Sequence, residues 1–307
     1  MNNSKTWPYI IGLCVAAAIW GFNFGISRLS MKSFPEEVFI LLRFGLALPI
    51  LFLILWIREG SILIRWKDAI WFMLLGFIGV TLLELLVMFS VKYTSLANAS
   101  LLNVAPWPIF VALFSPLFIK EPITRNTIIG GLAAMAGVTL VIMSGQGGFK
   151  FTQDAFLGDL AAFAVSIIGA MMSLTSMKLM QTYSPLRVTS WQILFGVLFL
   201  FPFTLQHWDK VSWVSLGFNE WAMVGYNVIF CTIVAFLLWN GCMRVVGATV
   251  ANFFRYVVPA AAVLAGYLMF DERITLGHGF GALLMGIGLI WITNGKNILL
   301  YFTKSKL

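Results

Sequence analysis

The chain has 307 residues, of which 60% are hydrophobic and only 10% are charged. Soluble domains carry about 25% charged residues, so this composition excludes an ordinary soluble protein and indicates one that lies within a membrane. The formal net charge of +8 does not indicate a nucleic-acid partner, because the basic residues lie scattered between apolar segments.

Apolar segments of roughly 20 residues follow one another along the chain, the length at which a helix crosses a hydrocarbon core about 30 Å thick. We predict ten transmembrane helices, over residues 8–27, 34–57, 69–90, 95–118, 126–143, 158–180, 186–203, 220–240, 246–270 and 277–295. The predicted fold class is therefore an all-α membrane protein. No motif for a cofactor or a metal is present.

The chain is internally duplicated. Residues 108–137 align without a gap to residues 259–288, and nine of the thirty positions are identical. The identical positions include those that break or end helices: Pro108, Glu121, Gly130 and Gly137 match Pro259, Glu272, Gly281 and Gly288. Internal symmetry in a membrane protein is typical of secondary transporters.

The basic residues predict the orientation. Segments on the side of the N-terminus hold twelve Lys and Arg residues, and those on the other side hold six. The positive-inside rule then places both termini in the cytoplasm, in a cytoplasmic (inner) membrane. Five helices per half is an odd number, so the two five-helix repeats are inverted. We expect a first repeat over 1–143, an external linker over 144–157, a second repeat over 158–295 and a cytoplasmic tail over 296–307.

Several motifs resemble those of the EamA-type branch of the drug/metabolite transporter superfamily. Trp20-Gly21-Phe22-Asn23-Phe24 resembles its early Trp-Gly motif, Arg43-Phe44 its arginine-aromatic pair, and the two Pro…Glu…Gly…Gly blocks the ends of its repeats. The resemblance covers about residues 8–295 and implies a ten-helix carrier of small metabolites, often an exporter of amino acids. The second half departs from the pattern: Ile168-Gly169 replaces the Trp-Gly motif, and Gln192 or Ile193 stands in the place of Arg43.

Two ionisable residues inside the predicted spans can meet. Arg43 and Glu84 lie nine and six residues from the outer ends of their helices, a depth difference of only about 5 Å. Charges inside a membrane are costly unless they are paired or hydrated. Two interpretations stay open: a structural ion pair between helices two and three, or a Glu84 that exchanges a proton or cation while Arg43 tunes its pKa.

Arg255 has no acidic residue at a matching depth. It shares one helix face with Asn252 and Pro259. Its guanidinium could bind a substrate carboxylate, or could instead extend toward cytoplasmic phosphates. Asn103 and Trp107, beside Pro106 and Pro108, mark irregular backbone that is tolerated only where it lines protein or a cavity.

The complete set of predicted substrate-binding residues is Trp20, Asn23, Arg43, Glu84, Asn103, Trp107, Gln192, Tyr226, Asn252 and Arg255. Amides, a ring and an unpaired cation suit a zwitterion or small anion, so we predict an alternating-access exporter or exchanger of amino acids or related carboxylated compounds. A lipid or lipid-linked flippase, a cationic drug exporter, a channel and an intramembrane enzyme are the alternatives. Small-residue faces such as Gly277-x-x-x-Gly281 are compatible with a monomer or a homodimer.

Overall fold

A computed structural model describes residues 6–94, 96–144, 155–271 and 273–304. In this part of the chain ten helical segments are long and apolar enough to cross a membrane, which confirms the predicted fold class. The first five spans, in chain order, are α1 (Trp7–Ser30); α2 (Glu36–Glu59); a third span made of η2 (Trp66–Asp68), α3 (Ala69–Gly76), η3 (Phe77–Leu82) and α4 (Leu83–Tyr93); a fourth made of α5 (Leu96–Val104) and α6 (Trp107–Phe118); and α7 (Arg125–Met143). The sixth and seventh spans are α8 (Phe156–Leu179) and α9 (Pro185–Thr204) with η4 (Leu205–Lys210). The eighth is made of α10 (Phe218–Tyr226), η6 (Asn227–Val234) and α11 (Ala235–Val246), the ninth of α12 (Ala248–Phe253), η7 (Phe254–Tyr256) and α13 (Val257–Phe270), and the tenth is α14 (Leu276–Lys304).

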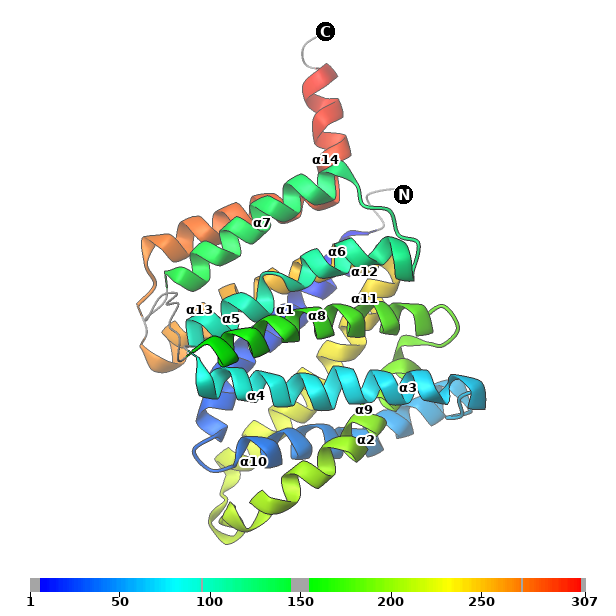
Figure 1. The fold of residues 1–307 in the computed structure, drawn as a ribbon, viewed down its shortest axis with the longest axis vertical. Coiled ribbons are helices and arrows are strands. Elements are labelled where there is room, and N and C mark those ends of the chain that lie inside the picture. The colour runs from blue at the N-terminus through cyan, green and yellow to red at the C-terminus, as the bar shows by residue number, and fades with distance from the viewer. Residues whose placement is uncertain (1–5, 95, 145–154, 272, 305–307) are drawn as a thin grey trace.

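The last helix departs from its predicted bounds. We expected it to end at residue 295, but α14 continues to Lys304. No proline follows to interrupt it, and the added segment is again rich in apolar residues. The red end of α14 projects beyond the bundle (Figure 1).

Helices α7 and α14 pack closely along one edge of the bundle and show that the repeats are inverted (Figure 1). A Cβ added to Gly130 would lie 2.6 Å from the carbonyl oxygen of Gly288, and one added to Gly137 would lie 2.6 Å from that of Gly281. Gly130 and Gly281 are equivalent in the two repeats, as are Gly137 and Gly288. This crosswise pairing requires antiparallel helices, and only glycine permits such close backbone contact.

The helices are also interrupted at equivalent places. The π-helical segments η3 and η6 lie at the same point of the third and eighth spans. The fourth span is broken between α5 and α6, and the ninth at η7. The two breaks meet: the hydroxyl of Tyr256 donates a hydrogen bond of 2.6 Å to the carbonyl of Ala105, 151 residues away. The bond satisfies one carbonyl that the broken helix leaves free, as a membrane interior requires.

We predict that Gly137→Ala lowers the free energy of unfolding by about 1–3 kcal/mol, because the added methyl would overlap the backbone of α14. Gly286→Ala is the matched control, since nothing lies within 4 Å of its Cβ position. Thermal unfolding of both variants in one detergent measures the difference. Equal unfolding temperatures would contradict the close contact.

Candidate functional site

A cation surrounded by indole rings lies where the halves meet. The guanidinium carbon of Arg255, in η7, is 3.7 Å from the ring centre of Trp107, 5.5 Å from that of Trp20 and 5.7 Å from that of Trp239. These rings come from the fourth, first and eighth spans. Within the described residues no carboxylate pairs with Arg255, and the side chain remains partly exposed. Cation–π contact therefore stabilises the charge while its hydrogen-bond donors stay available.

Asn252 holds the nearest ring in place. Its side-chain oxygen accepts hydrogen bonds of 3.0 Å from Nε1 of Trp107 and from the hydroxyl of Ser173, and its amide nitrogen donates to the carbonyl of Ala248 at 2.8 Å. Asn252 is fully buried. We predicted that this amide would orient substrate, but its polar atoms are engaged within the protein. In this structure Asn252 positions Trp107.

A difference between the repeats makes room for that ring. Gly21 faces the backbone carbonyl of Val258, at 2.5 Å from its added Cβ, whereas Gly169 lies directly against the indole of Trp107. Trp107 and Val258 are equivalent positions in the two repeats, 151 residues apart. At this pair of equivalent positions the first repeat therefore carries a tryptophan, the largest side chain, and the second carries the smaller valine. The sequence indicates a departure of the second repeat at Ile168 and at Gln192 or Ile193, and the structure adds this further difference at Trp107 and Val258.

Arg43 and Glu84 meet as predicted. Nη2 of Arg43 lies 3.3 Å from Oε1 of Glu84, with 13% and 19% of the two side chains exposed. The guanidinium also covers the Phe44 ring at 4.2 Å, and its Nε, which is buried, has no hydrogen-bond partner. Sequence reasoning missed Glu36, which stands seven residues before Arg43 on the same face of α2 and interacts electrostatically with Glu84. Near the predicted outer end, Glu84 thus has Arg43 as its ion-pair partner and Glu36 as a neighbouring carboxylate.

Aromatic rings connect the two arginine sites. Phe44, under Arg43, contacts Phe236 with 6.2 Å between ring centres, and Phe236 contacts Trp20 at 5.5 Å. Trp20 in turn contacts Trp239 at 5.2 Å and donates from Nε1 to the carbonyl of Cys231. Phe236 and Trp239 follow the π-helical segment η6, and the sequence offered no signal that they face inward.

The remaining predicted residues lie in different environments. Oδ1 of Asn23 and Nε2 of Gln192 are buried without a hydrogen-bond partner, so both amides retain binding capacity. Asn103, in α5, is partly exposed. The hydroxyl of Tyr226 is directed to the carbonyl of Ile19 at 3.4 Å, and its ring stacks on Phe230. These contacts engage Tyr226 within the protein, and no hydrogen bond or ring contact joins it to Arg255 among the described residues.

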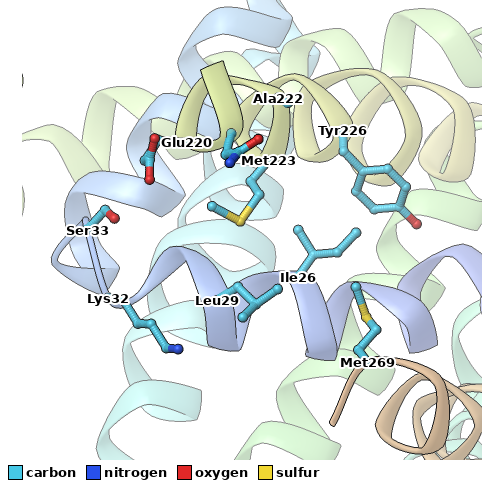
Figure 2. Close-up of a pocket in the computed structure, with 10 residues that line it drawn as sticks. Ile26, Leu29, Lys32, Ser33, Glu220, Ala222, Met223, Tyr226 and Met269 are labelled. Carbon is cyan, nitrogen blue, oxygen red and sulfur yellow. The ribbon is translucent and has the colours of Figure 1, made fainter. Parts of the chain in front are cut away.

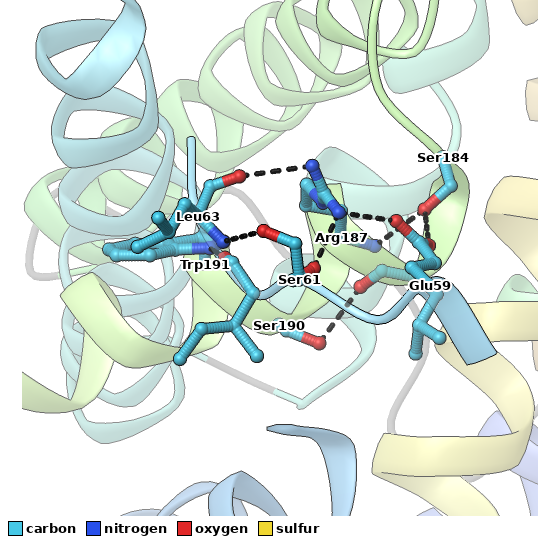
Figure 3. Close-up of polar contacts among 9 residues, drawn as sticks. Glu59, Ser61, Leu63, Ser184, Arg187, Ser190 and Trp191 are labelled. Atoms are coloured by element: carbon cyan, nitrogen blue, oxygen red, sulfur yellow. Dashed lines mark hydrogen bonds and ion pairs between the residues drawn. The ribbon is translucent and has the colours of Figure 1, made fainter. Parts of the chain in front are cut away.

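The predicted cytoplasmic end is tied across the two halves. Figure 3 shows Arg187, at the start of α9, pairing with Glu59 at 2.8 Å and donating to the carbonyls of Ser61 and Leu63 at 2.6 and 3.0 Å. The hydroxyl of Ser184 bonds to Glu59 as well. These bonds fasten the connection after α2 to the start of α9, so the two repeats cannot separate there without breaking an ion pair.

Glu121 forms a second tie at this end. Its carboxylate accepts hydrogen bonds from the backbone N–H groups of Ala248 at 3.0 Å and Thr249 at 3.3 Å, and so caps helix α12 of the other repeat. Gly247, just before the helix, has φ +96° and would bring a Cβ within 2.6 Å of Glu121. Glu121, one of the repeated residues at helix ends, therefore has a structural role at this turn. Glu272, its counterpart, lies outside the described residues.

These features define a class: a helical membrane protein built from two inverted repeats around a cation that aromatic rings surround and that no carboxylate of the described residues pairs with. A model of the EamA-like transporter family matches residues 7–143 and again residues 156–294. The chain therefore belongs to the EamA-like transporter family and is a multi-pass membrane transporter, which confirms the resemblance seen in its motifs.

Relatives and one solved structure agree with this assignment. The uncharacterized transporter YetK of Bacillus subtilis (strain 168) is 28% identical over 284 residues, which cover 92% of this chain and 86% of YetK. An uncharacterized transporter of Archaeoglobus fulgidus is 26% identical over 289 residues, covering 93% of this chain and 98% of that protein. A protein crystal structure shares the fold with a TM-score of 0.79 at 19% identity, covering 97% of this chain and 99% of its own.

We predict that Glu121→Ala lowers the free energy of unfolding by about 1 kcal/mol, because helix α12 loses its cap. Burial raises the pKa of Glu121 against the opposing effect of the backbone bonds. The folded protein therefore holds this proton more tightly than the unfolded chain, and stability falls as the pH rises from the ordinary glutamate pKa through the raised one.

Glu121→Gln keeps an acceptor for the helix and cannot ionise. It should be more stable than Glu121→Ala and should lack this part of the pH dependence. Thermal unfolding of the wild type and both variants at several pH values measures both effects. A Gln variant with the wild-type pH profile would contradict the assignment.

Proposed function

We propose that this transporter carries small carboxylated metabolites, with amino acids as the leading class, and that Arg255 binds the carboxylate. The observation that carries the proposal is an unpaired guanidinium held over Trp107, with its donors free. A guanidinium binds a carboxylate with two parallel hydrogen bonds, which are strongest away from water. The surrounding rings offer apolar contact to the rest of such a substrate.

The same rings argue against a cationic drug as the substrate. An aromatic cage binds a quaternary ammonium through the faces of its rings. Here the faces of Trp107, Trp20 and Trp239 already surround the cation of Arg255. A second cation would meet like charge, with no carboxylate of the described residues paired to Arg255 to offset it.

We further propose alternating access, with export toward the predicted external side. At the cytoplasmic end α12 packs against α6 and α8, and Thr249 bonds to Ser115 at 3.1 Å. At the other end, over the residues that the structure describes, α1 and α13 make no comparably extensive contact with α4 or α5. The repeat symmetry relates these two sets of contacts, so exchanging them would open the opposite end. The basic residues favour an inner membrane with both termini in the cytoplasm.

The proposal is tested with the purified protein in proteoliposomes. Arg255→Ala should weaken binding by about 1.5–3 kcal/mol, the contribution of a hydrogen bond to a charged group. Counterflow with an amino acid and with its amide measures the effect, and the loss should fall mainly on the carboxylated substrate. Arg244→Ala, which removes an exposed cation of α11, is the matched control.

Equal transport of an amino acid and its amide by the wild type would refute the role of Arg255. Transport of a fluorescent phospholipid, with no uptake of soluble metabolites, would instead favour a flippase.

We propose a coupling role for the pair of Arg43 and Glu84 as well. Glu84 pairs with the guanidinium of Arg43, and Glu36 interacts electrostatically with Glu84, so a proton or cation can neutralise the second negative charge. Glu84→Gln should abolish the pH dependence of transport and leave some facilitated exchange. Asp209→Asn, at an exposed acid, is the control and should keep the pH dependence.

A structural ion pair predicts a different pattern. In that case Glu84→Gln and Arg43→Gln each lower the yield of folded protein, the double variant restores it, and the pH dependence of transport is unchanged. Measuring folded yield and transport for all three variants separates the two interpretations.

A further inference from the structure

A cavity of about 540 Å³ lies between α1, α10 and α13 at the predicted external end (Figure 2). Its walls include Ile26, Leu29, Met223, Tyr226 and Met269, and its rim includes Lys32, Ser33, Asn219 and Glu220. It is separate from the arginine site. We propose that this cavity binds a phospholipid with a primary amine in its zwitterionic headgroup, with the apolar chain against the wall and the headgroup at the rim.

The cavity opens away from the interior of the bundle. On α1, Trp20 faces Arg255, and Gly21 and Gly25 pack against α13. Leu29 follows Trp20 by nine residues, or two and a half turns, and therefore stands on the opposite side of the helix. Ile26 and Ser33 share the side of Leu29. Ala222 and Met269 in the lining are themselves exposed, so a bilayer lipid can reach this cavity from the surface of the bundle without entering the transport path.

The polarity of the cavity changes along the helix as a lipid would require. Figure 2 shows Lys32, Ser33 and Glu220 together at one end, and Ile26, Tyr226 and Met269 at the other. Lys32 lies near the end of α1 and Ile26 nearly two turns deeper, a separation of about 9 Å along the axis. Polar groups at the membrane boundary and apolar groups below match a lipid of that leaflet.

The charges at the rim select the headgroup. Lys32 is exposed and suits a phosphate, while Ser33 and Asn219 add hydrogen-bonding groups. Glu220 uses Oε2 to accept from the backbone N–H of Gly217 at 2.8 Å and no described donor bonds to its other oxygen. That oxygen can accept from a primary ammonium. Phosphatidylethanolamine offers both partners, phosphatidylcholine offers no ammonium hydrogen, and phosphatidylglycerol offers no cation.

Native mass spectrometry of the delipidated full-length protein tests the proposal. Phosphatidylethanolamine, phosphatidylcholine and phosphatidylglycerol with identical acyl chains are titrated separately, and bound lipid is counted. The wild type should bind the first about ten- to a hundredfold more tightly than the other two, the effect of one charge-assisted hydrogen bond. Equal binding of the three lipids, or no retained lipid, would overturn the proposal.

Variants locate the site. Leu29→Trp should fill the cavity and remove the bound lipid, whereas Leu198→Trp, at an exposed position of α9, should not. Glu220→Gln keeps an acceptor for Gly217 but should remove the preference for the ethanolamine lipid over the choline lipid. Lys32→Gln should weaken all three.

Unchanged lipid binding in Leu29→Trp, or an unchanged preference in Glu220→Gln, would refute the site. Displacement of the lipid by an amino acid would show that the cavity belongs to the transport path and would refute it as well. Unfolding temperatures of the lipid-free variants show whether each is folded. The outcome is independent of the role proposed for Arg255.

Discussion

The enclosure of one guanidinium, that of Arg255, by indole rings without a carboxylate partner among the described residues is the constraint on which the centre of this protein depends. A cation inside a membrane protein is costly, and here the compensation comes from indole faces, with Trp107 at 3.7 Å. That ring is fixed in turn by Asn252 and Ser173, from two other spans. Four spans therefore define the surroundings of Arg255. A carboxylate partner would neutralise the charge, whereas the ring arrangement leaves Arg255 without one among the described residues.

Several contacts between the helices follow the symmetry of the two repeats, but the residues around Arg255 do not. The glycine contacts between α7 and α14, the paired π-helical segments and the bond from Tyr256 to Ala105 all obey the repeat. Trp107 does not, because its equivalent is Val258. A symmetric frame can exchange the contacts at its two ends at little cost, and an asymmetric centre can still bind one asymmetric molecule.

The two ends of the bundle are held by different chemistry. The predicted cytoplasmic end carries the ion pair of Arg187 and Glu59 and the helix cap by Glu121, whose partners are largely backbone groups. The predicted outer end instead places Arg43 against Glu84, with Glu36 nearby. The first set of contacts joins the two repeats, whereas the pair of Arg43 and Glu84 joins two spans of one repeat.

The sequence by itself determined the class of fold, because the length and spacing of apolar segments fix membrane spans, and the repeat at 151 residues fixes their inverted order. It also determined that Arg43 and Glu84 meet, since depth follows from counting residues along helices. Only the tertiary structure decided that Asn252 holds Trp107, that Trp239 covers Arg255 and that Tyr226 bonds to the carbonyl of Ile19. Such neighbours depend on how helices rotate about their axes, which π-helical segments and broken spans alter and which residue spacing does not record.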